Sequence, residues 1–187
     1  MRIISGTLKA RRFSVPKSFP SRPTTDFAKE GLFNVLEHQM ALYDLEILDL
    51  CAGTGNISFE FISREAGNLT AVDMNSNCLR FITKNAAELG IKEHLETIKS
   101  DILFYLKKTE RKFDLIFADP PYDYKFHHEI AEIVFERDLL VEGGFLIIEH
   151  GRHTKLEDKK HFDLVRQYGN VYFSFFRKEE EEEETND

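Results

Sequence analysis

Between residues 46 and 150 the sequence alternates short apolar segments with longer amphipathic ones, and this alternation limits the folds open to the chain. The apolar segments are "EILDL" (46–50), "LTAVD" (69–73), "LETIK" (95–99), "FDLIFAD" (113–119) and "GGFLIIEH" (143–150). The stretches between them, 56–66, 76–89, 102–109 and 126–137, have helical patterns. Strands that are apolar almost throughout, separated by amphipathic helices, are typical of a parallel sheet covered on both faces. The sequence therefore predicts a doubly wound α/β fold.

The two ends of the chain depart from this alternation. Residues 2–15 contain two short strand patterns, "RIIS" and "RRFSV", with Gly6 between them, which predict a small N-terminal β-hairpin. After residue 160, "HFDLVRQYG" and "NVYFSFFR" meet at Gly169 and Asn170. This pattern predicts a C-terminal antiparallel strand pair, which completes a mostly parallel sheet of seven strands.

A helix is expected near residues 24–37, where Thr24, Thr25 or Asp26 can cap it. Its apolar positions follow helical spacing and are Ala28, Leu32, Val35 and Leu36. Lys29 and Glu37 are expected to face the solvent.

The charges are concentrated at the two ends of the 187-residue chain, whose net charge is −8. Residues 1–30 carry seven basic side chains against two acidic ones, and residues 179–187 carry seven acids and no base. We expect an N-terminal hairpin and basic arm over 1–23, a main domain over 24–178 and a disordered acidic tail over 179–187. The basic arm is able to bind phosphates, and an ordinary solvated surface explains its composition equally well.

The composition favours a cytoplasmic protein without a metal. No apolar run approaches the roughly 20 residues that a membrane-spanning helix needs, and "MRIISGTLKARR" lacks the apolar centre of a secretory signal. Cys51 and Cys78 form neither a metal-ligand spacing nor a disulfide framework, so buried apolar roles are expected for them. The seven histidines show no metal-ligand spacing either. We expect a monomer that contacts no membrane.

The first strand of the alternation ends in "DLCAGTG", residues 49–55, immediately before a helix. Gly53 and Gly55 would let a ligand approach the backbone, and Asp49 can hold a positively charged group. A dinucleotide fingerprint would have a third glycine where this chain has Ser58, and a P-loop lysine is also missing from the motif. The motif predicts a small nucleoside ligand, while a tight strand-to-helix turn without a ligand stays possible.

Acidic residues also follow the second and third strands. Asp73 ends "AVD", where a carboxylate can accept both ribose hydroxyls of a nucleoside. Asp101 follows "KS", where it can accept the exocyclic amine of an adenine while Ile102 packs on the ring. Each acid alone is also a good helix cap, and for Asp101 this alternative stays open. Three acids at three successive strand ends predict one shared binding edge.

The fourth strand ends in Asp119, Pro120, Pro121 and Tyr122, a stretch with little backbone freedom. A ring-bound amine is a poor nucleophile because its lone pair is delocalised. A carboxylate and a preset backbone carbonyl that accept its hydrogens would aim that lone pair at an electrophile, and Tyr122 can stack on the base. The motif predicts an amine-alkylating site, against the alternative of an ordinary strand end broken by prolines.

Taken together, "RIISG", "RPTTDFAKEGLFNVL" (22–36), "DLCAGTGNISFEFISREAG" (49–67) and "FADPPY" (117–122) resemble the bacterial RsmD-type family. That family uses S-adenosylmethionine to methylate N2 of a guanine in small-subunit (16S) ribosomal RNA. The resemblance implies a Rossmann-like S-adenosylmethionine-dependent methyltransferase fold and a ribosomal RNA or assembling-subunit partner. It covers nearly the whole chain except the glutamate-rich tail.

The resemblance also implies roles for individual residues. Asp49, Gly53 and Gly55 would border the methionine part of the cofactor, Asp73 its ribose and Asp101 its adenine, with Ala52, Met74 and Ile102 in the same site. The amine site would be Asp119, Pro120, Pro121 and Tyr122. Arg2, Arg11, Arg12, Arg22 and Thr24 are the expected RNA contacts. This chain has Ser5 and Lys29 where the family often has glycine and arginine, which bears on how the N-terminal arm engages RNA.

Three other functions are compatible with parts of the sequence. D-P-P-Y suits methylation of adenine N6 equally well, although the chain leaves little room for a DNA-reading region. A catalytically idle RNA-binding assembly factor would keep the fold, and the intact Asp119 to Tyr122 motif argues against it. A nicotinamide-dependent oxidoreductase is disfavoured by Ser58.

Overall fold

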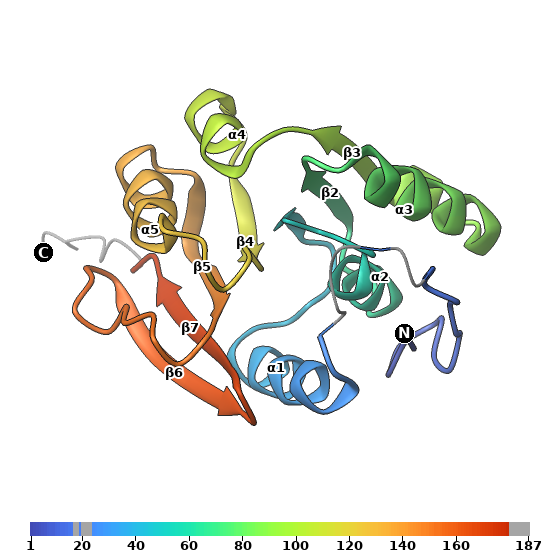
Figure 1. Ribbon diagram of the computed structural model, residues 1–187, viewed down its shortest axis with the longest axis horizontal. Helices are drawn as coiled ribbons and strands as arrows, with labels where there is room; N and C mark the ends of the chain where they lie inside the picture. Colours follow the sequence, from blue (N-terminus) through green and yellow to red (C-terminus); the bar gives the residue numbers. More distant parts are fainter. Residues whose placement is uncertain (17–18, 20–23, 180–187) are drawn as a thin grey trace, which may run out of the picture.

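The computed structural model describes residues 1–16, 19 and 24–179, and its centre is a twisted sheet of seven strands (Figure 1). The strands are β1 (Glu46–Leu50), β2 (Asn68–Asp73), β3 (Leu95–Lys99), β4 (Phe113–Ala118), β5 (Leu140–His150), β6 (Phe162–Tyr168) and β7 (Val171–Arg177). Their order is β3-β2-β1-β4-β5-β7-β6. The first five are parallel, whereas β7 runs antiparallel to both β5 and β6. The predicted parallel sheet and C-terminal antiparallel pair are confirmed.

Helices cover both faces of the sheet, and each face has its own apolar core. Helices α1 (Asp26–Gln39), α2 (Asn56–Ser63) and α3 (Ser76–Leu89) contribute to one core. Helices α4 (Ile102–Lys108) and α5 (His127–Glu136) contribute to the other, on the opposite side in Figure 1, and a short 3-10 turn, η1 (Lys92–His94), precedes β3. Because both faces are covered, the central strands are apolar on both sides, which is the pattern that the sequence shows.

The predicted N-terminal hairpin is present but short, with one antiparallel bridge between Arg2 and Arg12. Beside the bridge, the Ile3 amide donates to the Arg11 carbonyl at 3.0 Å and the Phe13 amide donates to the Met1 carbonyl at 3.1 Å. The backbone of this hairpin also donates hydrogen bonds to α2. The amides of Ile4 and Ser5 donate to the Glu60 carboxylate at 2.8 and 3.0 Å, and the amide of Leu8 donates to Ser63 Oγ at 3.0 Å. The expected pairing of the two segments is therefore confirmed in a short form, and α2 side chains hold this hairpin against the main domain.

Gly6 makes this contact with α2 possible. Its φ of +82° and its position against Ser63 leave no space for a side chain, because an added Cβ would lie 1.8 Å from the Ser63 carbonyl oxygen.

The expectation that Lys29 faces the solvent was also wrong, whereas Glu37 is exposed as predicted. Lys29 is fully buried between α1, α2 and the N-terminal segment. Its ammonium lies 3.0 Å from Glu60 Oε2 and donates to Asn56 Oδ1 at 3.0 Å and to the Arg2 carbonyl at 2.5 Å. Burial lowers the pKa of Lys29, and the Glu60 charge opposes that shift. A tertiary ion pair therefore decides the side chain's position.

Arg22, Pro23 and residues 180–187 of the expected acidic tail lie outside the described residues. Among the helices of the part that is described, none is both long enough and apolar enough to cross a bilayer.

Candidate active site

One cavity of about 670 Å³ lies at the carboxyl ends of the parallel strands. Its walls come mainly from the residues at and after the ends of β1, β2, β3 and β4, from the end of β5 and from Thr24 and Thr25 just before α1. The strand order reverses between β1 and β4, and this is the point where open α/β sheets bind ligands. The structure brings Asp49, Asp73, Asp101 and Asp119 together in this cavity, although they lie far apart in the sequence.

The loop after β1 forms the floor of the cavity through left-handed backbone turns. Cys51, Gly53 and Gly55 have φ values of +61°, +55° and +74°. Ala52 and Gly53 line the cavity, whereas Gly55 lies behind the wall, where an added Cβ would meet Ile82 at 2.9 Å. Gly55 thus permits α2 to pack on α3, and Gly53 presents its backbone to the cavity.

Asp49 is buried on the cavity floor, and its carboxylate accepts a hydrogen bond from the Ser58 hydroxyl. Burial raises the pKa of Asp49 to about 7, the Asp73 charge adds to this rise and the Ser58 hydrogen bond opposes it. Ser58 occupies the position where a dinucleotide site would have its third glycine. In this chain that position serves to orient an acid instead of admitting a pyrophosphate.

The Asp73 carboxylate is fixed by the backbone on both of its oxygens. The amide of Gly53 donates to Oδ2 at 2.9 Å, and the amide of Asn75 donates to Oδ1 at 2.7 Å. Each oxygen keeps a lone pair for a further donor. The side chain is partly exposed on the cavity wall, so a vicinal diol is a suitable ligand.

Asp101 combines the two roles that the sequence left open. Its Oδ1 accepts the Phe104 amide at 3.0 Å and caps α4, while the residue also lines the cavity. Ile102 is buried beside it, and Met74, which is exposed, lines the same cavity. An acid and two apolar side chains around a slot fit a flat heterocycle with an exocyclic amine.

Asp119 follows β4 and enters the same cavity beside the β1 end. Its amide donates to the Leu50 carbonyl at 3.1 Å, and Pro120 and Pro121 then turn the chain so that the Tyr124 amide donates to the Pro121 carbonyl at 2.8 Å. Burial raises the pKa of Asp119 well above its ordinary value, and the charges of Glu149 and Asp49 raise it further.

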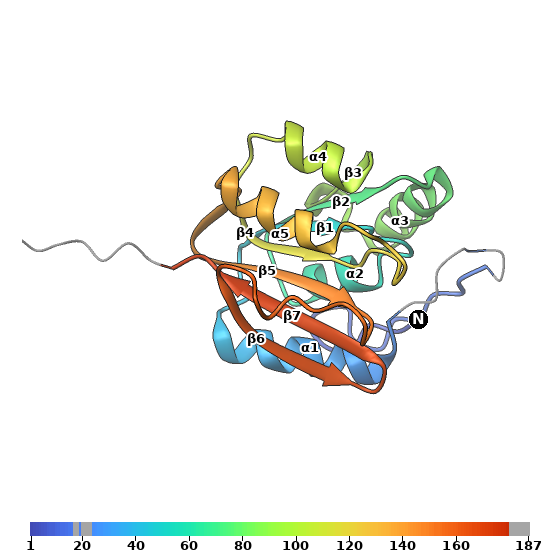
Figure 2. The same ribbon diagram turned by 60° about the vertical axis from the view of Figure 1, so that its left-hand side comes forward.

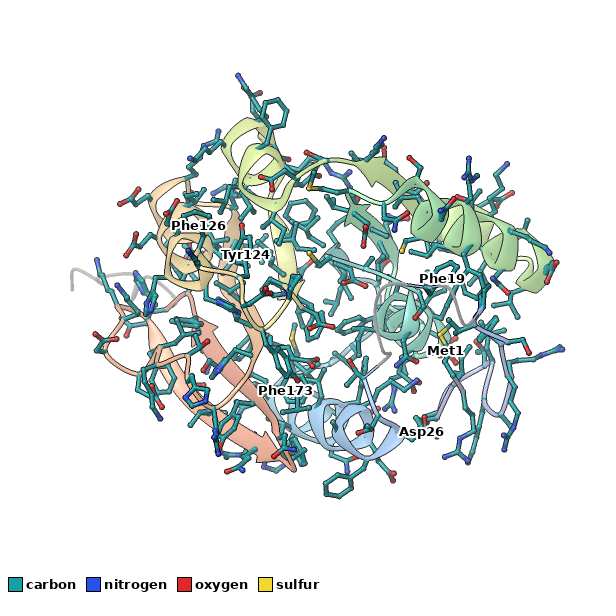
Figure 3. All side chains as sticks on the ribbon, in the orientation of Figure 1. Met1, Phe19, Asp26, Tyr124, Phe126 and Phe173 are labelled. Carbon is teal, nitrogen blue, oxygen red and sulfur yellow. The ribbon has the colours of Figure 1, made fainter. Side chains whose placement is uncertain are left out.

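Aromatic side chains surround the D-P-P-Y turn. Tyr122 is half exposed, and its hydroxyl donates to Glu149 Oε1 at 3.4 Å. Tyr124 lines the cavity, and burial raises the pKa of its hydroxyl to about 12. Figure 3 shows Tyr124 and Phe126 side by side in the loop after β4, with ring centres 5.5 Å apart.

Glu149, at the end of β5, is a cavity residue that the sequence reasoning missed. It is only 4% exposed, and burial raises its pKa to about 7. Its Oε2 accepts the Thr24 hydroxyl at 3.1 Å. The signal was present in "IIEH", because the rule that identified acids at the ends of the first four strands applies equally to the fifth.

Cys51 packs against the apolar core, as expected, but it is only partly buried and also lines the cavity. Burial and the surrounding carboxylates raise the pKa of its thiol, with Asp73 and Asp119 the largest of the acidic contributions. The thiol therefore stays protonated and is a poor nucleophile.

The expected RNA-contact residues are divided between the cavity and the N-terminal segment. Thr24 is a cavity residue, held by Asn56, whose Nδ2 donates to the Thr24 carbonyl at 2.9 Å. Arg2 forms an ion pair with Asp26 at 3.0 Å, and Arg11 and Arg12 are exposed. Figure 2 shows the N-terminal segment on the same side of the molecule as the β5 tip.

Within residues 1–16, 19 and 24–179 no group of histidine, cysteine and acidic side chains is arranged to hold a metal ion. A doubly wound sheet with an antiparallel C-terminal pair, with acids at successive strand ends and a D-P-P-Y turn, defines a Rossmann-like methyltransferase. The chain belongs to the RsmD family: residues 1–177 match the family model described as "Conserved hypothetical protein 95".

Named relatives agree with this family. The chain is 32% identical over 167 residues to ribosomal RNA small subunit methyltransferase D of Buchnera aphidicola subsp. Acyrthosiphon pisum, covering 88% of this chain and 85% of that protein. It is 29% identical over 170 residues to the protein of the same name from Haemophilus influenzae, covering 89% and 87%.

Solved structures share the fold. Escherichia coli yhhF has a TM-score of 0.83 at 24% identity, covering 96% of this chain and 98% of that one. An RNA methyltransferase from Salinibacter ruber, in complex with S-adenosyl-L-homocysteine, has a TM-score of 0.65 at 16% identity, covering 89% and 99%.

Proposed function

We propose that this protein transfers a methyl group from S-adenosylmethionine to the exocyclic N2 of a guanine in small-subunit (16S) ribosomal RNA. The methyltransferase family and the relatives named as small-subunit ribosomal RNA methyltransferases support the cofactor and the RNA class. The observation that carries the proposal is the single cavity in which the D-P-P-Y turn meets the acids of β1, β2 and β3.

The residues of the cavity fit the three parts of the cofactor. Buried Asp49 suits the ammonium of the methionine part, with Ala52 and Gly53 beside it. The backbone-fixed Asp73 carboxylate suits the ribose hydroxyls.

The adenine would lie in the neighbouring part of the cavity. Only Oδ1 of Asp101 caps α4, so Oδ2 can accept a hydrogen bond from the adenine amine. Ile102 and Met74 would pack on the adenine ring. When bound, S-adenosylmethionine supplies a methyl group on a sulfonium.

Asp119 to Tyr122 would form the acceptor site. Tyr122 is half exposed, so its ring is accessible for stacking on a base, and such a contact is typically worth ~1–3 kcal/mol. Asp119 and the preset carbonyls of the proline turn accept the two amine hydrogens, which directs the nitrogen lone pair at the methyl carbon. Since guanine N2 lies in the minor groove of a duplex, the target must lie in a loop or be flipped from its stack.

The transfer proceeds in one step, in which a nitrogen–carbon bond forms as the sulfur–carbon bond breaks. The nitrogen then loses one proton. When Asp119 is ionised, its carboxylate is a suitable acceptor for this proton because a raised pKa makes it a stronger base. A covalent route through Cys51 is disfavoured because its thiol stays protonated, although it lines the cavity. Positioning accounts for most of the rate.

The basic N-terminal segment would supply phosphate contacts through Arg2, Arg11 and Arg12, together with Arg22. Thr24 would join this segment to the base site, since its hydroxyl reaches Glu149 inside the cavity. The substrate is the ribosomal RNA itself or an assembling small subunit, and the enzyme acts as a monomer in the cytoplasm.

Transfer of labelled methyl to small ribosomal subunits from cells lacking this protein tests the proposal. Nucleoside analysis should place the label in N2-methylguanosine, whereas label on adenine N6 would contradict the proposed atom. Asp119→Ala should abolish turnover and leave cofactor affinity nearly unchanged. Asp123→Ala, an exposed acid in the same turn, is the matched control and should keep full turnover. Loss of both turnover and cofactor binding in Asp119→Ala would show that Asp119 is structural.

A further inference from the structure

Glu149 and Asp119 are neighbours at the ends of adjacent parallel strands. β4 and β5 pair in a register that aligns Ala118 with Ile148, so the next residues along the two strands are Asp119 and Glu149. Side chains alternate between the two faces of a sheet, and Phe117 and Ile147, two residues earlier, both belong to the core shared with α1 and α2. Both carboxylates therefore point to the same face, and adjacent strands are ~4.8 Å apart.

The partners of Glu149 within the described residues are hydroxyls. Thr24 donates at 3.1 Å to Oε2, and Tyr122 donates at 3.4 Å, a long bond, to Oε1. None of the ion pairs found among those residues involves Glu149. A carboxylate has about four acceptor positions, so this buried acid keeps acceptor capacity toward the cavity that it lines.

The ring of Tyr122 lies beside the end of β5. An added Cβ on Gly151 would lie 3.3 Å from Tyr122 Cδ2, and the Tyr122 hydroxyl reaches Glu149. If a base stacks on the Tyr122 ring and places its amine at Asp119, the edge of the base next to that amine lies near Glu149.

We propose that Glu149 accepts a hydrogen bond from N1–H of the target guanine and thereby selects guanine over purines that have a lone pair at N1. This inference rests on the proposed function. In guanine, the N1–H and N2 amine donors are adjacent, and they match the two adjacent acceptors Glu149 and Asp119. Adenine presents an acceptor at N1, so an ionised Glu149 would face a lone pair and lose its partner.

2-Aminopurine is a suitable probe because it keeps the 2-amine but has a lone pair at N1. The methylated guanine is first mapped with the wild-type enzyme, and small subunits are then reconstituted with guanine or 2-aminopurine at that position. Wild type should prefer guanine by at least about 100-fold in kcat/KM, since a site built to bind N–H rejects an analogue without it. Glu149→Gln should reduce this preference to about 10-fold or less, because the carboxamide can rotate and donate to N1.

The ratio between the two substrates separates recognition from a structural role. If Glu149 only supported Thr24 and Tyr122, Glu149→Gln would slow both substrates alike and leave the preference unchanged, which would overturn the proposal. 2-Aminopurine also lacks O6, but that loss affects both enzymes equally. Tyr122→Phe removes the hydroxyl donor without changing the acceptor, so it should keep the preference for guanine. Cofactor titration checks that each variant is folded.

Two negative results have different meanings. Equal methylation of guanine and 2-aminopurine by the wild type would overturn the inference alone. No N2-methylguanosine on guanine-containing subunits would overturn the proposed function, and the inference with it.

Discussion

Cofactor affinity should depend on the ionisation of Asp49. In the free protein, burial raises the pKa of Asp49 to about 7, so the side chain holds a proton below that pH. A cofactor ammonium beside it would favour the charged form and lower the pKa, so binding expels the proton. Affinity should therefore rise as the pH increases from 5.5 to 7.0 and level off above 7.

The size of the effect follows from this shift. At pH 5.5 only about 3% of Asp49 is ionised in the free protein if its pKa is 7, against about half at pH 7.0. If the pKa in the complex lies below 5.5, affinity should increase about 15-fold over this range, in which an α-amino group stays protonated. Calorimetry at pH 6.0 in buffers of different ionisation enthalpy should detect release of about 0.9 proton.

Asp49→Asn is the decisive variant because an amide oxygen can still accept the Ser58 hydroxyl but cannot ionise. The variant should bind the cofactor more weakly at pH 7.0 than the wild type, with no pH dependence from this site and no released proton. Glu149→Gln is the control and should keep the dependence, since Glu149 lies at the acceptor end. A wild-type affinity that stays constant between pH 5.5 and 7.0 would refute the assignment of Asp49 to the ammonium.

Three further predictions test other parts of the structure. Asp73→Ala should weaken cofactor binding by at least about 100-fold in a calorimetric titration, because two charge-assisted hydrogen bonds are lost; unchanged affinity would remove the ribose assignment. Lys29→Met should lower the free energy of unfolding by about 3 kcal/mol in denaturant titrations, since Glu60 loses a buried counter-charge; a loss below about 1 kcal/mol would contradict this. Replacing Arg11 and Arg12 with alanine should reduce the salt slope of RNA binding by about 2; an unaltered slope would indicate a solvated surface.

Matched substitutions control for general effects. Lys84→Met changes an exposed lysine whose ion-pair partner, Glu88, is also exposed, so its effect on stability should be within about 0.5 kcal/mol. Exchange of Lys107 and Lys108 for alanine removes two positive charges from α4 and should leave the salt slope of RNA binding nearly unchanged.

The sequence determined the element order and the edge at which the site forms. The spacing of apolar residues that distinguishes strands from helices is a local property of the sequence. The ends of α3, at Ser76 and Leu89, were predicted correctly because local residues mark them: Asn75 caps one end and Gly90 the other. Parallel strands bring their carboxyl ends to one edge, so the acids of the first four strands could be assigned to a shared site from their positions alone.

Only the tertiary structure decided how distant groups pair. Lys29 is buried because Glu60, on another helix, forms an ion pair with it, and the N-terminal hairpin packs on α2 because Glu60 accepts hydrogen bonds from its backbone. Glu149 lies beside Asp119 because β5 pairs with β4 in the register that aligns Ile148 with Ala118. Such contacts depend on free energies of burial and pairing between segments far apart in the chain, whereas sequence periodicity reports only which face of its own element a residue occupies.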